Sequence, residues 1–379
     1  MKKKVLSSLL ARGLAVTLLA SPWVVASAQA ATEGAALTPG KEYMVVANYP
    51  NSLHVVDLEQ DTVFKSCELP GAFGPGAIQV SPDRSMAYIL NNRFSDIYGV
   101  HLDSCEVRFH AAMSQAPNER ARSIFSIALS PDGKELYTVQ NPTLLEKDHY
   151  RVQPPRLAVY DTSAGLDARP LRLLPAPRQA SVMQTGADGA LYMVGADIYK
   201  VDPVSGERSV AIPSRNWARE RYSPPDVLYA WPQQTPTREF SVLYTAARFA
   251  DDSMDMDSAE FRYGFMSVNL ETGATETTDF AELTEIYFTG MRSPKDPNVI
   301  FGVLNRLAKY DIKEQKLIGS AELDHAYYVV NLNQAGSKVY LAGTWNDIAV
   351  YDADSMTKLG NIQLPGGDMS LGTPQVFVR

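Results

Sequence analysis

Residues 77–110 read AIQVSPDRSMAYILNNRFSDIYGVHLDSCEVRFH. This stretch holds four short runs rich in β-branched and aromatic residues: Ala77–Val80, Met86–Leu90, Asp96–His101 and Glu106–His110. Turn residues separate them, and the first turn, Ser81–Arg84, has the Pro and Asp that favour a tight reversal. Such runs between turn signals predict four antiparallel strands.

The same unit recurs along the whole chain. A strand ends in a small polar residue before a turn at Asp57, His101, Asp161, Asp202, Asn269, Asp311 and Asp352. Self-similarity at a period of roughly 40 to 65 residues is typical of propeller blades. The sequence therefore predicts an all-β fold, a seven-bladed β-propeller. We expect the recurring polar residue to accept backbone N–H groups of the next turn, because seven scattered copies cannot form one catalytic centre.

Blades three to seven follow the same order. The predicted strands are 124–129, 135–140, 156–160 and 170–174 in blade three, and 181–184, 190–194, 197–201 and 208–212 in blade four. In blade five they are 227–231, 240–246, 264–268 and 275–278, and in blade six 286–291, 299–303, 307–310 and 316–320. In blade seven they are 327–331, 338–342, 348–351 and 357–362.

Blade one is incomplete at its N-terminal end. It has only Tyr43–Ala47, Leu53–Val56 and Val63–Cys67, while one strand, Pro374–Val378, is left over at the C-terminus. We predict that this last strand completes blade one and closes the ring, which leaves no open sheet edge.

The first 30 residues have the features of a secretory signal. Lys2–Lys4 form a basic start, a mostly apolar stretch follows, and Ala28–Ala30 is a small-x-small cleavage site. Arg12 argues against the alternative, a membrane anchor. We expect cleavage after Ala30, a periplasmic location and one mature domain, 31–379.

Charge and cysteine content limit the function further. Loss of the four signal-peptide cations changes the formal net charge from −8 to about −12, which disfavours binding to nucleic acid or anionic membranes. Cys67 and Cys105 fall near the outer strands of blades one and two, at different heights, so a disulfide and two separate thiols both stay open. No Cys-x-x-Cys-His motif for covalent haem is present.

The long connections are predicted to gather on one face. They join strand two to strand three or one blade to the next, at 111–123, 141–155, 213–226 and 247–263. Long connections in a compact domain are often functional, so we expect this face to bind a partner or ligand. Candidate contacts there are His149, Tyr150, Trp217 and Tyr222, and, near the axis, His325, Tyr327, Tyr328 and Trp345. The acidic residues of 247–263 lack the Gly of a calcium loop and indicate a solvated loop.

Catalytic motifs are missing from the sequence. It has no Gly-x-Ser-x-Gly elbow, His-Glu-x-x-His or phosphate loop. Asp324, Asn305, Asn331 and Asp347 could contribute to a central metal ring, but no repeated inward carboxylate is evident. We therefore expect no catalytic, cofactor-binding or metal-binding residue on this chain, which favours a rigid binding scaffold.

Several stretches resemble one family. These are IFSIALSPDGK (124–134), VQPPRLAVYD (152–161), APRQ (176–179), PDVL (225–228), YTA (244–246), HAYYVVN (325–331) and DIAVYD (347–352). In this order, with the same long insertions, they resemble the β subunit of quinohaemoprotein amine dehydrogenase.

The resemblance implies a periplasmic heterotrimer. An α subunit would carry two c-type haems, and a small γ subunit would carry cysteine tryptophylquinone. The β subunit, a propeller without its own cofactor, would line the pocket where a primary amine is converted to aldehyde and ammonia. Electrons would pass to a soluble periplasmic acceptor. The alternatives are a free-standing, lactonase-like propeller hydrolase and a propeller binding protein.

Overall fold

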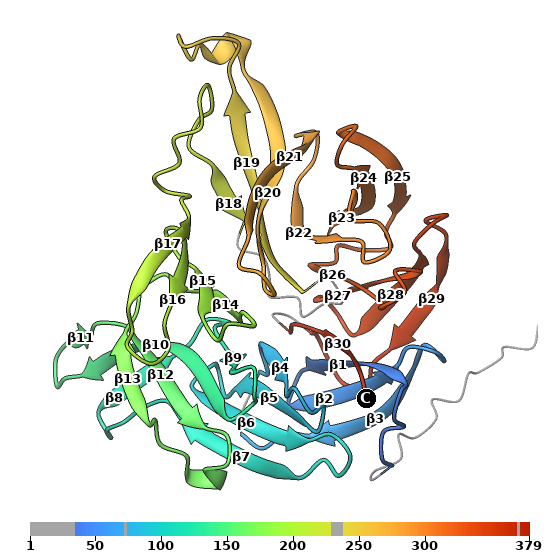
Figure 1. Cartoon of the computed structure of the whole chain (residues 1–379). Helices are drawn as coiled ribbons and strands as arrows, with labels where there is room; N and C mark the ends of the chain where they lie inside the picture. Colours follow the sequence, from blue (N-terminus) through green and yellow to red (C-terminus); the bar gives the residue numbers. More distant parts are fainter. Residues whose placement is uncertain (1–34, 72–73, 229–237, 370–371) are drawn as a thin grey trace, which may run out of the picture. The chain divides into compact units, whose positions relative to one another are not determined.

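The chain forms seven antiparallel sheets in a ring, which confirms the seven-bladed β-propeller (Figure 1). The computed structural model describes residues 35–71, 74–228, 238–369 and 372–379. The predicted signal peptide and its cleavage site lie outside these residues, as does the end of the strand predicted at 227–231.

Blade one is completed by the C-terminal strand, as predicted. Its strands, from the axis outward, are β30 (Gln375–Val378), β1 (Glu42–Asn48), β2 (Ser52–Asp57) and β3 (Thr62–Glu68). Met44 pairs with Val376, and in Figure 1 the last strand lies beside the first. The ring is therefore closed by backbone hydrogen bonds between the two ends of the described chain.

The other blades keep chain order from the axis outward. Blade two has β4 (Ile78–Val80), β5 (Met86–Asn91), β6 (Asp96–His101) and β7 (Val107–Ala112), and blade three has β9 (Ala128–Leu129), β10 (Glu135–Leu145), β12 (Arg156–Asp161) and β13 (Arg172–Pro175). Blade four has β14 (Val182–Thr185), β15 (Leu191–Val194), β16 (Ile198–Val201) and β17 (Arg208–Ile212), and blade five has β18 (Asp226–Leu228), β19 (Glu239–Arg248), β20 (Glu260–Asn269) and β21 (Thr275–Glu282). Blade six has β22 (Tyr287–Arg292), β23 (Val299–Leu304), β24 (Arg306–Asp311) and β25 (Lys316–Glu322), and blade seven has β26 (Val329–Leu332), β27 (Lys338–Ala342), β28 (Asp347–Asp352) and β29 (Lys358–Gln363).

The core is divided among the interfaces between neighbouring blades. Each adjacent pair, including the pair formed by blades seven and one, shares a cluster of buried apolar side chains. Alternate residues of each strand point to opposite sides of its blade, so every blade contributes to two clusters. The blades are thus held mainly by apolar burial between their faces.

The recurring polar residue at the end of the third strand stabilises the following turn. Asp57 Oδ1 accepts the backbone N–H groups of Glu59 and Gln60, at 3.0 and 3.1 Å. The corresponding side chains of the other six blades accept from the same region of their turns. This agrees with the structural role predicted for them.

The long connections contain more β structure than predicted. The outer half of β10 (Glu135–Leu145) pairs with two short strands, β8 (Glu119–Arg122) and β11 (Tyr150–Val152). Strands β19 and β20 extend into both ends of 247–263, and a 3-10 turn, η2 (Met256–Ser258), lies near the tip. The loop is therefore shorter than predicted, because cross-strand pairing runs to Arg248–Glu260, but its acidic side chains are exposed, as predicted.

The first strand of blade three is shorter than expected. The predicted range was 124–129, whereas β9 spans only Ala128–Leu129. Phe125 has a φ of 53°, in the left-handed region, which interrupts an extended strand. The other short helix, η1 (Gly165–Asp167), lies between β12 and β13.

Cys67 and Cys105 form a disulfide. It joins β3 of blade one to the turn between β6 and β7 of blade two, with a Cα–Cα distance of 5.2 Å. The bond therefore adds a covalent link across one of the seven apolar interfaces.

A buried histidine gives the fold a testable pH dependence. His54 bonds to Ser66 Oγ at 2.7 Å and Asn48 Oδ1 at 2.9 Å, and burial lowers its pKa to about 4. The unfolded chain binds this proton near pH 6.5, so stability is expected to fall between about pH 6.5 and about 4, by up to about 3 kcal/mol. Urea unfolding at several pH values measures this.

His54→Gln is the matched variant, because it cannot titrate in this range. The unfolding free energy of the wild type is expected to approach that of the variant as the pH falls. A constant difference between the two over this pH range would contradict the assignment.

Candidate functional site

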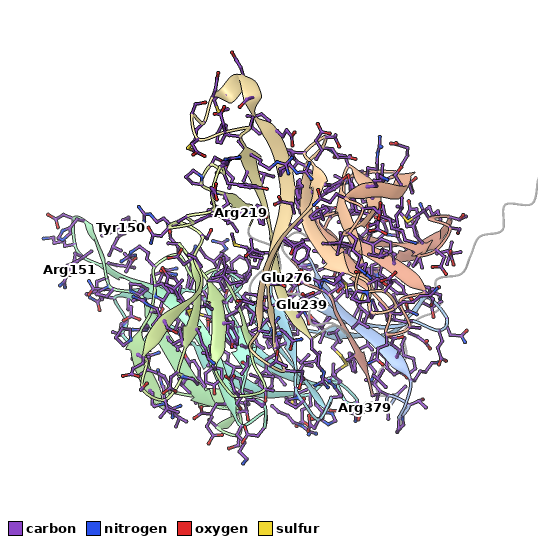
Figure 2. The ribbon with its side chains drawn as sticks, turned by 45° about the horizontal axis from the view of Figure 1, so that its top comes forward. Tyr150, Arg151, Arg219, Glu239, Glu276 and Arg379 are labelled. Carbon is purple, nitrogen blue, oxygen red and sulfur yellow. A yellow bond between two sulfur atoms is a disulfide. The ribbon has the colours of Figure 1, made fainter. Side chains whose placement is uncertain are left out.

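The long connections occupy one face of the ring. Because neighbouring strands are antiparallel, links from strand two to three and from blade to blade all emerge there. Figure 2 shows Tyr150 and Arg151 at the end of one projection, apart from Arg219 on another connection. We call this side the long-connection face.

An acidic residue organises the blade-seven part of this face. Asp347, at the start of β28, is 7% exposed and accepts three side-chain hydrogen bonds. His325 Nε2 lies 2.9 Å from its Oδ1, while Tyr327 and Asn361 each donate to Oδ2 at 2.7 Å. Burial, followed by the bond to Asp347, raises the pKa of Tyr327. These four residues, named the Asp347 cluster, form a rigid polar platform.

Trp345 is presented to solvent by this platform. Its side chain is 62% exposed, and its ring stacks on His325 with centroids 5.0 Å apart and planes 16° from parallel. Its φ is 53°, which is unfavourable for a bulky residue. Strain of this kind persists where surrounding contacts impose it, and it is concentrated at functional sites. Here the carbonyl of Trp345 accepts from Met369 N at 2.6 Å.

A second polar group lies in blade five. Asp279 on β21 accepts from both Nη atoms of Arg219, at 2.9 and 3.2 Å, and from the hydroxyls of Tyr222 and Tyr244. Burial opposes ionisation, but the bonds from the two tyrosines and Arg219 outweigh it and lower the pKa of Asp279. Trp217 packs edge-on against Tyr244, with centroids 4.9 Å apart.

The β11 projection in blade three carries exposed side chains. Tyr150 is 76% exposed and Val152 is 61% exposed. His149 bonds only to its neighbour, Asp148, at 2.8 Å among the contacts described. Arg151 pairs with Glu146, and the backbone of β11 pairs with β10, which keeps the hairpin ordered. The arm is thus ordered and solvent-facing.

The eight predicted site residues therefore form separate groups. His325, Tyr327 and Trp345 meet at the Asp347 cluster, whereas Tyr328 packs on Phe288 at 4.8 Å. Trp217 and Tyr222 belong to the Asp279 group, and both are half-buried in intramolecular contacts. His149 and Tyr150 stand on the β11 projection.

Sequence reasoning missed the residues that hold these groups together. Asp279, Tyr244 and Asn361 were not singled out, and Asp347 was considered only for a metal ring. One signal was available for Asp347, since Asp96 also begins the third strand of its blade and Asp197 directly precedes the third strand of blade four. No comparable signal marks Asp279, whose partners come from distant parts of the sequence.

The described ranges show neither a metal-binding cluster nor a membrane-spanning helix. They contain no group of three or more His, Cys, Asp or Glu side chains placed to hold a metal ion. In the same ranges, no helix has the length and apolar character needed to cross a membrane.

A cavity of about 830 Å³ opens on the opposite face, at the axis. Its walls are the inner strands and the turns that follow them, including Gln79, Leu129, Gln184 and Phe377. None of the site residues predicted from the sequence lies in this cavity, because the short turns of this face match ordinary structural turns.

Comparison with known proteins supports the fold only. The chain matches no protein-family model, and no curated protein matches it. Among solved structures it is similar to hydrazine synthase from Kuenenia stuttgartiensis, with 15% identity, a TM-score of 0.50, and coverage of 83% of this chain and 90% of that one.

Two other solved structures show a comparable likeness. A functionally unknown protein from Desulfotomaculum acetoxidans has 11% identity and a TM-score of 0.52, with 86% of this chain and 98% of that one covered. Dihydro-heme d1 dehydrogenase NirN has 13% identity and a TM-score of 0.48, with 92% and 77% covered. The likenesses to hydrazine synthase and to the Desulfotomaculum protein, at these low identities, support a shared fold alone.

Proposed function

We propose that this chain is the propeller subunit of a periplasmic amine dehydrogenase of the quinohaemoprotein class. It holds a small quinone-bearing γ subunit and a dihaem α subunit, and its long-connection face forms one wall of the amine pocket. The quinone and haems of the partners supply the redox chemistry. This chain supplies a fixed surface that orients the partner and excludes water, which quinone chemistry requires.

The presentation of Trp345 is the observation that supports this proposal best. A large aromatic side chain is exposed in a strained backbone conformation, and a buried network holds the ring beneath it. Tryptophan is enriched among the residues that dominate binding energy at interfaces. Since its position is fixed before binding, little side-chain entropy is lost when a partner covers it.

Two further features agree with a scaffold role. Tyr150 and Val152 extend the exposed apolar surface at the β11 projection. The two cysteines of the sequence are joined to each other. A quinone built from cysteine and tryptophan would therefore be carried by another chain.

Replacing Trp345 with Ala is expected to weaken the binding of the γ subunit to this chain. Loss of an interface anchor of this kind typically costs at least about 2 kcal/mol, or roughly a 30-fold weaker Kd. Amine turnover should fall in parallel when subunits are diluted. Affinity is measured by titrating purified γ into the variant.

Val204→Ala is the matched control, because Val204 is also exposed but lies in the β16–β17 turn, on the opposite face. It should bind γ like the wild type. If Trp345→Ala and Tyr150→Ala both leave γ binding and turnover unchanged, the long-connection face is not the interface.

The identity of the complex is tested by purifying it from its host. We expect haem absorbance and a small quinone-staining subunit to co-elute with this chain. A monomer with lactone-hydrolysing activity would instead support the hydrolase alternative, and a monomer with neither property would support a binding protein.

A further inference from the structure

The axial cavity on the short-turn face has the size and lining of a ligand site. At about 830 Å³, it falls within the range of small-molecule pockets. Its walls are apolar in part, with Val80, Leu129, Val376 and Phe377 from three inner strands. The turns after the inner strands surround its mouth. The cavity lies on the face away from the proposed subunit interface and is independent of the proposed function.

One wall residue is a cation without a carboxylate partner. Arg84 lies outside ion-pair distance of every acidic side chain in the described ranges, although it lines the cavity. Burial, with the nearby charge of Arg238, lowers the pKa of Arg84. An anion bound beside the guanidinium would replace the solvation that Arg84 loses on burial. It would also offset the repulsion between Arg84 and Arg238.

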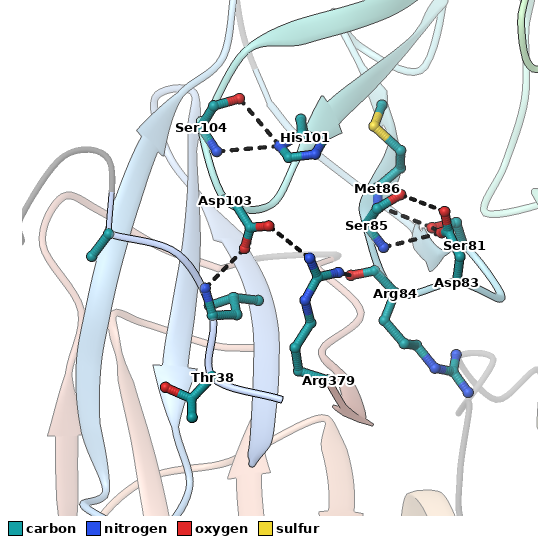
Figure 3. A network of polar contacts seen from close by, with 12 residues as sticks. Thr38, Ser81, Asp83, Arg84, Ser85, Met86, His101, Asp103, Ser104 and Arg379 are labelled. Carbon is teal, nitrogen blue, oxygen red and sulfur yellow. Dashed lines mark hydrogen bonds and ion pairs between the residues drawn. The ribbon is translucent and has the colours of Figure 1, made fainter. Parts of the chain in front are cut away.

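The backbone at Arg84 is held in place by its surroundings. Its φ is 62°, and its N–H donates to Ser81 O at 2.9 Å to close the turn. Asp83 accepts from Ser85 N and Ser85 Oγ, and Arg379 donates to the carbonyl of Arg84. In Figure 3 the guanidinium of Arg84 points away from this network, with no polar contact drawn to it. The side chain is therefore fixed at its base and available at its tip.

Two of the other polar wall residues have side-chain amides with an unpaired nitrogen. Gln79 and Gln184 are 1% and 5% exposed, and each has an Nε2 atom with no hydrogen-bond partner. An unpaired buried donor costs about 1–3 kcal/mol. Both residues line the cavity, from β4 and β14, so an oxygen-bearing ligand could accept from them after a rotation of the terminal amide.

We propose that this cavity binds a small organic monocarboxylate, with the carboxylate on Arg84, the apolar body against Val376 and Phe377, and remaining oxygens near Gln79 and Gln184. A planar guanidinium matches a carboxylate with two parallel hydrogen bonds.

The charges at the mouth select for a single negative charge. Arg238 pairs with Glu271, and Arg292 lies 3.3 Å from Glu239 and 2.8 Å from Glu276, so the acidic cavity residues already have cationic partners. Among the charged residues that line the cavity in the described ranges, Arg84 is the one without an opposite charge within ion-pair distance. A dianion such as phosphate would place its second charge near Glu239 and Glu271, where repulsion disfavours it.

Calorimetric titration of the purified full complex with benzoate and octanoate tests the proposal. Benzyl alcohol, octanol and benzylamine have the same bodies without the negative charge, and phosphate is the dianion control. We expect saturable binding of at least one carboxylate and of none of the controls. Arg84→Gln should weaken that binding about tenfold to a hundredfold, the value of a charge-assisted pair. Arg84→Lys should retain part of it.

Gln79→Leu provides a second variant that keeps the charge of the site. It should weaken the binding of a carboxylate that also carries a hydroxyl, such as mandelate, more than it weakens the binding of benzoate. Val204→Ala, an exposed residue of the β16–β17 turn that does not line the cavity, should bind carboxylates like the wild type. Absence of carboxylate binding, equal binding by Arg84→Gln, or equal binding of benzylamine would overturn the proposal. Each of these results leaves the Trp345 test unaffected, so the two proposals fail separately.

Discussion

Deleting residues 374–379 is expected to destabilise the whole propeller by more than about 5 kcal/mol, which is a large part of the stability of an ordinary domain. The deletion removes β30, whose backbone pairs with β1 from Glu42 to Val45. It also removes Phe377, which is 3% exposed and packs near Tyr43. Truncating a buried phenylalanine to alanine alone typically costs about 3–5 kcal/mol. Urea unfolding followed by circular dichroism measures the loss.

Arg379→Ala is the control for this deletion. Arg379 donates to Asp103 at 2.6 Å and to the carbonyl of Arg84, and Figure 3 shows these contacts joining the chain end to blade two. The variant keeps β30, so we expect a loss of only about 1–2 kcal/mol. An unchanged unfolding midpoint after the deletion would show that β30 does not close the ring in solution.

Removing the disulfide is expected to lower the unfolding free energy by about 4 kcal/mol. Cys67 and Cys105 are 38 residues apart, and a cross-link over a loop of this length restricts the unfolded chain by about that amount. Cys67→Ala/Cys105→Ala should therefore unfold at a lower urea concentration with an unchanged native circular-dichroism spectrum.

Reductant supplies the matched comparison. Dithiothreitol should shift the wild type to the midpoint of the double variant and leave the double variant unchanged. If reductant does not alter the wild-type midpoint, the bond contributes nothing to stability.

The propeller architecture could be predicted from the sequence because its signals, the turns and the strand ends, are local. Each turn such as Ser81–Arg84 and each strand-ending Asp repeats, and repetition makes a weak signal strong. The role of the C-terminal strand could be predicted because blade one lacks one strand and one strand is left over, and a ring with an open sheet edge is unfavourable. These inferences needed no knowledge of which side chains touch.

The functional groups were predicted only in part, because they depend on contacts between distant segments. His325, Tyr327 and Trp345 were selected from adjacent links, but Asn361 comes from an outer strand. Asp279 gathers Arg219 and Tyr222 from one connection and Tyr244 from β19. The axial cavity was missed since Gln79 and Gln184 look like ordinary strand residues until the inner strands are placed around an axis.

Ring closure by β30 also has a consequence for the order of folding. Strand β1 precedes the other described strands, whereas its partner β30 follows all of them, and of the described strand pairs this one spans the most residues. Contacts so distant in sequence form slowly. Until β30 is available, blade one has an unpaired inner edge and the ring stays open. If the chain is exported as we propose, this delay would keep it unfolded during translocation and confine assembly of the propeller to the far side of the membrane.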